Sequence, residues 1–406
     1  MAAISRVHNL NYIKELKSVD WDFKNVKNGG INHFHWYPAT FPSAIPGTLI
    51  PILSSPGDIV VDPFSGSSTT GIEAVRLGRN IIGFDTNPVA VLLSRAKHYF
   101  PTKSSIYKEF KYDEYTNDWP LMPSPKTLHP QEEELLQWYH PRTYKELLYL
   151  LEKISKIKNS KLRESMQAVL SSILKSTCSQ TKHWGWICDN VKPKKGDIQY
   201  KNAFVAFDRA IEKYLEASEV IISDMKHKGI DSTRKSIRKR SEIKHIDCNS
   251  GLERLKSESV DLILTSPPYN GVADYIKSQR LSYLWFDHEE LDVLGYNFAS
   301  FNELRKTEMG SRSHRYRKNS FDVYINYMNR FFLESRRVIK PEGKIALILG
   351  ESKARKATIE EIIESAISSG FEVVYRSERD IKPSRARLMA KVKNEDVIVF
   401  TVKNNN

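Results

Sequence analysis

Cysteine is scarce in this sequence. Only three of the 406 residues are cysteine, which excludes a disulfide framework and fits a reducing compartment. No run of about 18 apolar residues occurs, so we expect no transmembrane helix. The first 20 residues lack the apolar core typical of a signal peptide. The sequence is therefore expected to act in the cytoplasm.

Basic and aromatic residues, by contrast, are plentiful. The 62 lysines and arginines outnumber the 49 acidic residues, which gives a net charge of +13. Such an excess favours a polyanionic partner, nucleic acid first and a membrane surface second, although a basic solvated surface would give the same count. Of the two we expect nucleic acid and no membrane partner. Hydrophobic residues make up 40% of the chain and aromatic residues 11%. This composition excludes intrinsic disorder for the bulk of the chain.

Alternating strand and helix patterns predict an α/β fold. Residues 58–64 and 80–87 are short, apolar and β-branched, and helical patterns follow them at 66–78 and 88–100. The same rhythm resumes after residue 242. We predict a Rossmann-like, seven-stranded, mostly parallel sheet whose last two strands are antiparallel. The five later strands are expected at 243–248, 260–270, within 331–352, at 371–379 and at 395–403.

A long segment interrupts this rhythm. Residues 101–242 begin with proline-rich loops and continue with three apolar helical faces, around 144–154, 166–174 and 204–215. We interpret this segment as a mainly helical insertion and a candidate DNA-recognition region. Residues 1–100 then hold the first half of the α/β domain, and residues 243–406 hold the second half.

The segment VDPFSGSSTT, residues 61–70, has the features of a ligand loop at a strand end. Asp62 ends the strand, and Gly66 allows a tight turn and a close approach to a ligand. A second acid, Asp85, ends the next strand, where a carboxylate can accept both hydroxyls of a ribose. The phosphate-binding patterns GxGxxG and GxxxxGK[ST] are absent. A nucleoside without phosphates therefore fits this loop better than a dinucleotide does.

The segment TSPPYN, residues 265–270, follows a buried strand. Its two prolines stiffen the turn and remove two N–H donors, so that the carbonyls of Ser266 and Pro267 are available as acceptors. Together with Tyr269, which could stack on a ring, such a turn suits an amino group on a planar base. An ordinary proline-rich loop is the alternative, but the position at a strand end favours a site.

Together these two segments resemble the DNA amino-methyltransferases, which methylate N4 of cytosine or N6 of adenine with S-adenosylmethionine. DPFSGSSTTGIEA is similar to the cofactor motif of the family, and TSPPY is similar to its catalytic motif. HWYPATFPSAIPGTLI resembles the N-terminal motif that packs against the methionine end of the cofactor. One departure is Ser68, which stands where the family has its second glycine. The resemblance implies the following cofactor-binding residues: Asp62, Pro63, Phe64, Gly66, Ser67, Thr69, Thr70, Asp85, Asn87, Asp247 and Cys248.

The same resemblance implies that Ser266, Pro267, Pro268 and Tyr269 form the catalytic turn. Serine at its first position favours cytosine N4 over adenine N6. We therefore expect a site-specific enzyme that acts on double-stranded DNA in a bacterial cytoplasm. A cognate restriction endonuclease is a further candidate partner. The alternatives are adenine methylation, an RNA or protein-glutamine substrate of the same fold, and a silent binding module. A C5-cytosine enzyme is set aside because none of the three cysteines follows a proline.

Two basic runs are candidate DNA contacts. The first runs from Lys226 to Arg240 and the second from Arg305 to Lys318, and each contains a single acidic residue. Solvated loops are the alternative. A zinc site at Cys178, His183 and Cys188 is disfavoured, so no metal is expected. The residues selected for DNA binding are Arg238, Lys239, Arg240, Arg305, Lys306, Arg312, Arg315, Arg317 and Lys318.

Overall fold

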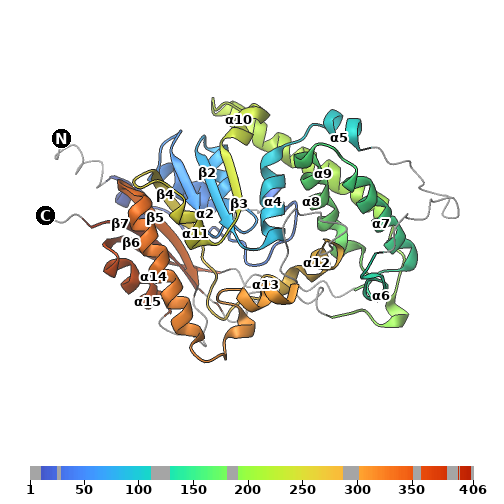
Figure 1. The fold of residues 1–406 in the computed structure, drawn as a ribbon. Coiled ribbons are helices and arrows are strands. Elements are labelled where there is room, and N and C mark those ends of the chain that lie inside the picture. Colours follow the sequence, from blue (N-terminus) through green and yellow to red (C-terminus); the bar gives the residue numbers. More distant parts are fainter. Residues whose placement is uncertain are drawn as a thin grey trace.

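A seven-stranded sheet organises the described part of the chain in the computed structural model (Figure 1). The structure describes residues 11–24, 29–110, 129–180, 191–286, 301–350, 358–381, 392 and 394–403. The strand order is β3-β2-β1-β4-β5-β7-β6, and only β7 runs against its neighbours. This confirms the predicted Rossmann-like α/β class and the antiparallel last pair. The strands are β1 Ile59–Asp62, β2 Asn80–Asp85, β3 Ser241–His245, β4 Val260–Thr265, β5 Ile339–Gly350, β6 Phe371–Asp380 and β7 Asn394–Val402.

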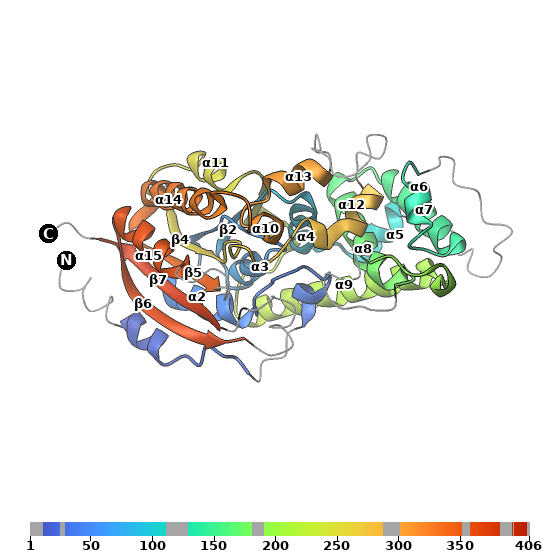
Figure 2. The ribbon, with the colours of Figure 1, turned by 90° about the horizontal axis from the view of Figure 1, so that it is seen from below.

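Helices cover both faces of the sheet, because its central strands are apolar on both sides. Val60 and Leu262 face one hydrophobic core, whereas Val61 and Ile263 face the other. One face is covered by α2 (Ala44–Leu53), α3 (Thr69–Arg76) and α4 (Pro88–Tyr99). The other is covered by α11 (Cys248–Glu253), α14 (Ser320–Val338) and α15 (Thr358–Ser368) (Figure 2).

The helices predicted for residues 101–242 are present, and they extend the first of these two cores. Helix α8 packs on α4, and α7 and α9 pack on α8. Side chains of the three helices belong to the same buried cluster as those of α4, so the segment is fastened to the sheet domain. The described elements here are α5 Lys103–Glu109, α6 Glu132–Leu135, α7 Pro141–Ser155, α8 Ser160–Thr177, η4 Lys195–Asp197, α9 Ala203–His227 and α10 Arg234–Lys239.

Short elements surround the carboxyl ends of the strands. Between β4 and β5 the described residues form irregular loops and four short helical pieces. The long helix α14 then begins at Ser320, eleven residues earlier than the sequence pattern indicates. Among the described helices, none is long and apolar enough to cross a membrane. The remaining elements are η1 Gly30–His33, η5 Lys277–Gln279, α12 Arg280–Phe286, α13 Phe301–Thr307 and η7 Arg312–His314.

Candidate active site

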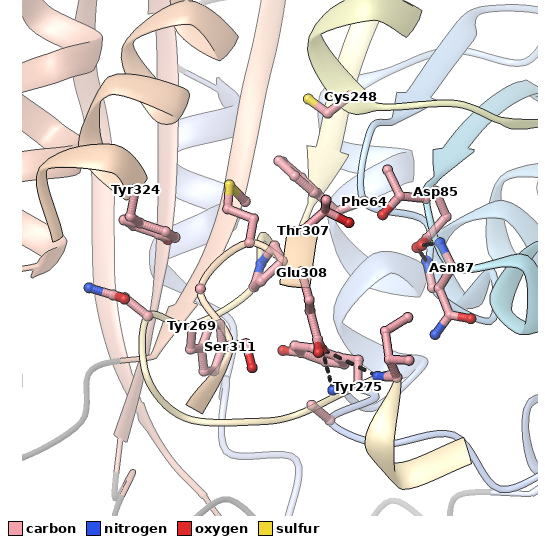
Figure 3. A pocket seen from close by; sticks show the side chains of 18 of the residues that line it. Phe64, Asp85, Asn87, Cys248, Tyr269, Tyr275, Thr307, Glu308, Ser311 and Tyr324 are labelled. Atoms are coloured by element: carbon pink, nitrogen blue, oxygen red, sulfur yellow. Dashed lines mark hydrogen bonds between the residues drawn. The ribbon is translucent and has the colours of Figure 1, made fainter. Parts of the chain in front are cut away.

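A cavity of about 420 Å³ opens where β1, β2 and β4 end (Figure 3). The carboxyl ends of parallel strands meet at one edge of a sheet, so loops distant in sequence converge there. The cavity brings together both motifs recognised in the sequence and part of the N-terminal segment 37–41. The predicted site residues that line it are Pro63, Phe64, Gly66, Ser67, Thr69, Asp85, Asn87, Asp247, Cys248, Ser266, Pro268, Tyr269, Lys306, Arg317 and Lys318.

Side chains of helix α4 hold the loop that follows β1 by hydrogen bonds. Ser94 donates a hydrogen bond to the Gly66 carbonyl at 2.8 Å, and the Lys97 ammonium donates to the Ser67 carbonyl at 2.7 Å. His98 bonds the Ser68 hydroxyl at 2.9 Å. Lys97 is fully buried, and burial lowers its pKa to about 7. Side chains of one helix therefore hold three consecutive residues of the loop.

The serine that replaces the family's second glycine is accommodated locally. Ser68 adopts the left-handed conformation, with φ of 65°. Its hydroxyl fills the space beside Gly71, where an added Cβ would lie 2.2 Å from Ser68 Oγ. Gly66 is also left-handed, and a Cβ there would lie 3.3 Å from the Tyr37 ring. The loop therefore keeps its tight shape, because His98 bonds the serine hydroxyl and Gly71 leaves space for it.

Asp85 presents a carboxylate to the cavity. It accepts the backbone N–H groups of Gly66 and Asn87, each at 2.8 Å. Burial raises the pKa of Asp85 to about 6, and the two hydrogen bonds oppose this rise. The side chain of Asn87 caps α4 and accepts a hydrogen bond from the Tyr283 hydroxyl. The acid is therefore held rigidly between the loop and the next helix, with lone pairs left for a ligand.

Asp247 and Cys248 form the neighbouring wall. The Asp247 carboxylate caps α11 by accepting the Asn249 and Ser250 N–H groups, and the Tyr327 hydroxyl donates to it as well. Most of its hydrogen-bonding capacity is thus used within the protein. Burial raises the pKa of the Cys248 thiol well above its usual value, so the thiol stays neutral.

Two predicted cofactor residues lie behind the loop, outside the lining of the cavity. Asp62 and Thr70 are buried, and the Asp62 carboxylate accepts the Thr265 hydroxyl at 2.6 Å. Burial raises the pKa of Asp62 to about 6, while the hydrogen bond from Thr265 lowers it. Asp62 therefore joins the end of β1 to the end of β4 instead of facing a ligand.

The catalytic turn is fixed by a chain of hydroxyl groups. Ser266 Oγ donates to the Tyr269 hydroxyl at 3.3 Å, and that hydroxyl donates to Glu395 Oε1 at 2.9 Å. Glu395 is fully buried and also pairs with Arg379. The Tyr269 ring is 4% exposed and packs on Gly350, where a Cβ would lie 2.3 Å from the ring. Pro267 lies within the turn but not in the lining of the cavity.

The two basic runs lie at opposite ends of the sheet. The second supplies Lys306, Arg317 and Lys318 to the mouth of the cavity. The first ends in α10, which leads into the amino end of β3, whereas the cavity lies at the carboxyl ends. In Figure 1, α10 lies above the sheet and α13 below it. Within the runs, Arg305, Arg312, Arg315, Arg238, Lys239 and Arg240 do not line the cavity.

Several residues that line the cavity are not predicted by any sequence motif. Glu308 is the single acidic residue of the second basic run, and Tyr324 and Tyr327 belong to α14, which begins before the helical pattern predicts. None of these side chains sits in a motif, and only the amphipathic period of α14 could have drawn attention to its tyrosines. For metals, the described residues contain no cluster of potential ligands. Cys178 is buried, while His183 and Cys188 lie outside the described residues.

Comparison with known proteins bears on the identity of this site. A family model described as DNA methylase matches residues 6–95 and 260–406, more than half of the chain. The chain belongs to this DNA methylase family. It is an S-adenosylmethionine-dependent DNA amino-methyltransferase, and DNA is its substrate.

The similar curated proteins carry related names. The Type II methyltransferase M.MjaII of Methanocaldococcus jannaschii is 20% identical over 90% of this chain and 82% of its own length. The Type II methyltransferase M.MvaI of Kocuria varians is 21% identical over 94% of this chain and 93% of its own length. The DNA adenine methyltransferase YhdJ of Escherichia coli is 42% identical, but over only 22% of this chain and 32% of its own length.

The cavity fits the family's cofactor. S-adenosylmethionine, when bound, supplies an activated methyl group on a sulfonium. Its ribose has two hydroxyl donors, and the carboxylate of Asp85 on the cavity wall can accept both. The left-handed Gly66, which has no Cβ, allows the backbone of the loop to approach a ligand closely. We propose that Phe64, Asp247 and Cys248 surround its adenine, and that the segment 37–41 lies by its methionine end.

We predict that Asp85→Asn lowers the affinity for S-adenosylmethionine by about 1–3 kcal/mol, because a charge-assisted hydrogen bond is lost. In the unchanged protein the affinity should fall as the pH drops through about 6, since protonation removes the anionic acceptor. Titration calorimetry at several pH values measures both effects. Asp197→Asn, an exposed site on the insertion, is the matched control. Equal affinity of the Asp85 variant and the unchanged protein would remove Asp85 from the site.

Proposed function

We propose that this protein methylates N4 of cytosine at a specific sequence in double-stranded DNA. The observation that supports an amino group as the target is the relay from Ser266 through Tyr269 to Glu395, and the choice of cytosine rests on serine at position 266. Because the Ser266 hydrogen points to Tyr269, the lone pairs of its oxygen are left to accept hydrogen bonds. An exocyclic amino group has two hydrogens to donate, so the turn is preset as an acceptor for it.

The catalytic turn would activate the amino group by fixing the geometry of its nitrogen. An exocyclic amine is a weak nucleophile, because its lone pair is delocalised into the ring. Hydrogen bonds from its two N–H groups to Ser266 Oγ and the Pro267 carbonyl would favour a tetrahedral nitrogen and localise the lone pair. Pro268 stiffens the turn, and Tyr269 offers a ring face to a base flipped out of the duplex. Catalysis then rests on positioning and electrostatics.

Adenine N6 is the second candidate target. It is favoured by the similarity of one segment to a protein named as a DNA adenine methyltransferase. The amino groups of the two bases present the same pair of donors to the turn, so the relay serves either. Serine at position 266 supports cytosine, as the sequence motif suggested. The Type II names of the longer matches support a role beside a separate restriction endonuclease.

Nucleoside analysis of methylated DNA tests the target directly. Purified protein should transfer labelled methyl groups to duplex DNA, and hydrolysis should release N4-methylcytosine. Sequencing of methylated positions in a host that expresses the protein should map them to one short motif. N6-methyladenine as the product would overturn the base assignment and leave the acceptor turn in place. Incorporation into RNA with none into DNA would contradict the proposal.

We predict that Tyr269→Phe lowers turnover about tenfold, because the hydroxyl that orients Ser266 is lost while the ring remains. The affinity for S-adenosylmethionine should stay within about twofold, because the relay does not hold the cofactor. Single-turnover methylation and calorimetry separate the two effects. The control is Tyr107→Phe, on the exposed face of α5. An unchanged rate in the Tyr269 variant would mean that the relay does not set the acceptor.

We propose that the second basic run holds the DNA backbone at the mouth of the cavity. Replacing Arg317 and Lys318 by alanine should weaken DNA binding and make its salt dependence shallower, by about one unit of slope per lost phosphate contact. Binding titrations from low to high salt measure the slope. A double alanine variant at Lys239 and Arg240 removes the same charge from the opposite end. A slope for the Arg317 and Lys318 variant equal to that of the unchanged protein would show that the second run is only solvated.

A further inference from the structure

Glu308 is a carboxyl group at the cavity wall that the proposed chemistry has not used. It comes from the loop after α13, within the second basic run. Its Oε1 accepts the backbone N–H groups of Tyr275 and Ile276, the latter at 3.2 Å. In Figure 3 its side chain lies between Tyr269 and Ser311 on one side and Asp85 and Asn87 on the other. Glu308 therefore lies between the catalytic turn and the loop that follows β1, called the cofactor loop below.

The loop that carries Glu308 is fastened along the catalytic turn. The Gly271 N–H donates to the Gly310 carbonyl at 2.8 Å, and the Arg312 N–H donates to the Ala273 carbonyl at 3.0 Å. A Cβ at Gly310 would lie 3.5 Å from the Pro268 carbonyl oxygen. These contacts place residues 308–312 beside 268–276. The position of Glu308 relative to Ser266 is thus set by backbone hydrogen bonds.

The groups around Glu308 favour its neutral form. Burial raises the pKa of Glu308 to about 8, and the charge of Asp274 adds to the rise. The two backbone N–H groups and Arg305 act in the opposite direction. His314 faces the same loop, and burial lowers the pKa of its imidazole, so it stays neutral near pH 7 and above. With Oε1 accepting two hydrogen bonds, the proton of the carboxyl group belongs on Oε2. That oxygen receives no hydrogen bond from the described residues.

We propose that Glu308 donates a hydrogen bond to the ring nitrogen beside the amino-bearing carbon of the target base. In cytosine this nitrogen is N3, and in adenine it is N1; both are acceptors. The bond would fix the ring so that the amino group meets Ser266. No proton is transferred, because the ring nitrogen is a weaker base than this carboxylate. The assignment rests on the proposed function, since it requires a flipped base in the cavity.

The assignment also gives the site a basis for rejecting other bases. Thymine and guanine carry an N–H at the corresponding ring position and a carbonyl in place of the amino group. A donor from Glu308 would then face a donor, and Ser266, set as an acceptor, would face a carbonyl. Buried groups left unpaired in this way discriminate more strongly than shape alone. One carboxyl and one hydroxyl would together select bases with an amino group next to an acceptor nitrogen.

The test combines variants of Glu308 with a modified base. Duplexes carry the mapped recognition site with either cytosine or 3-deazacytosine as the target, or 1-deazaadenine if adenine is the mapped base. For wild type, loss of the ring nitrogen should slow single-turnover methylation about 10- to 100-fold. Glu308→Ala should slow methylation of the natural base by a similar factor, with no further loss on the deaza base. If the loss caused by Glu308→Ala and the loss caused by the deaza base multiply, the assignment is overturned, because Glu308 then acts independently of the ring nitrogen.

A conservative variant separates this role from support of the loop. Glu308→Gln keeps an acceptor for Tyr275 and Ile276 and offers an amide N–H to the ring nitrogen. The wild-type rate should fall as the pH rises through about 8, because ionisation removes the donated hydrogen. The glutamine variant should retain most of the rate at pH 7 and show no such fall. A fall of equal size in both would overturn the assignment.

The controls distinguish this assignment from the proposed function itself. Glu364→Gln, at an exposed position of α15, should behave as wild type on both bases. Binding of S-adenosylmethionine to the Glu308 variants, measured by calorimetry, should match wild type and confirm the fold of the cofactor side. If wild type methylates no DNA base, the proposed function fails and this assignment fails with it. If wild type is active but shows no loss on the deaza base, this assignment alone fails.

Discussion

The hydrogen bond from Thr265 to Asp62 joins the two halves of the site. Asp62 ends β1 and starts the cofactor loop, and Thr265 ends β4 and starts the catalytic turn. Both side chains are buried and 2.6 Å apart, so neither loop can shift without breaking this contact. In-line methyl transfer requires the donor and the acceptor to be held in alignment, and a misplacement of about 1 Å can slow the reaction about 100-fold. An interaction that bridges adjacent parallel strands meets that requirement.

A second level of support fixes each loop from behind. Ser94, Lys97 and His98 of α4 hold the cofactor loop, while Glu395 of β7 and Arg379 of β6 hold the tyrosine of the catalytic turn. These supports come from elements that do not themselves line the cavity. The rigid scaffold thus leaves the ligand-facing atoms of Asp85 and Ser266 available, as expected of a site that works through preorganised hydrogen bonds.

The sequence predicted the parts of this arrangement that depend on local pattern. Buried β-branched runs and turn residues revealed the strands, and the two motifs at strand ends located both halves of the site. Position in space was harder to predict. The basic run ending at Arg240 holds seven lysines and arginines and the one ending at Lys318 holds six, yet only the topology of the sheet shows that they lie at opposite ends. Glu308 and Glu395 reach the site through an irregular loop and a late strand, where no period marks an inward-facing side chain.

The most direct measurement of the central claim is a crystal structure with a non-reactive analogue of S-adenosylmethionine and a duplex carrying the mapped site. The account predicts one base flipped into the cavity, with its amino nitrogen within hydrogen-bonding distance of Ser266 Oγ and the Pro267 carbonyl. The ribose of the analogue should lie on Asp85. A base seated away from Ser266, or an analogue bound outside the loop that follows β1, would contradict the account.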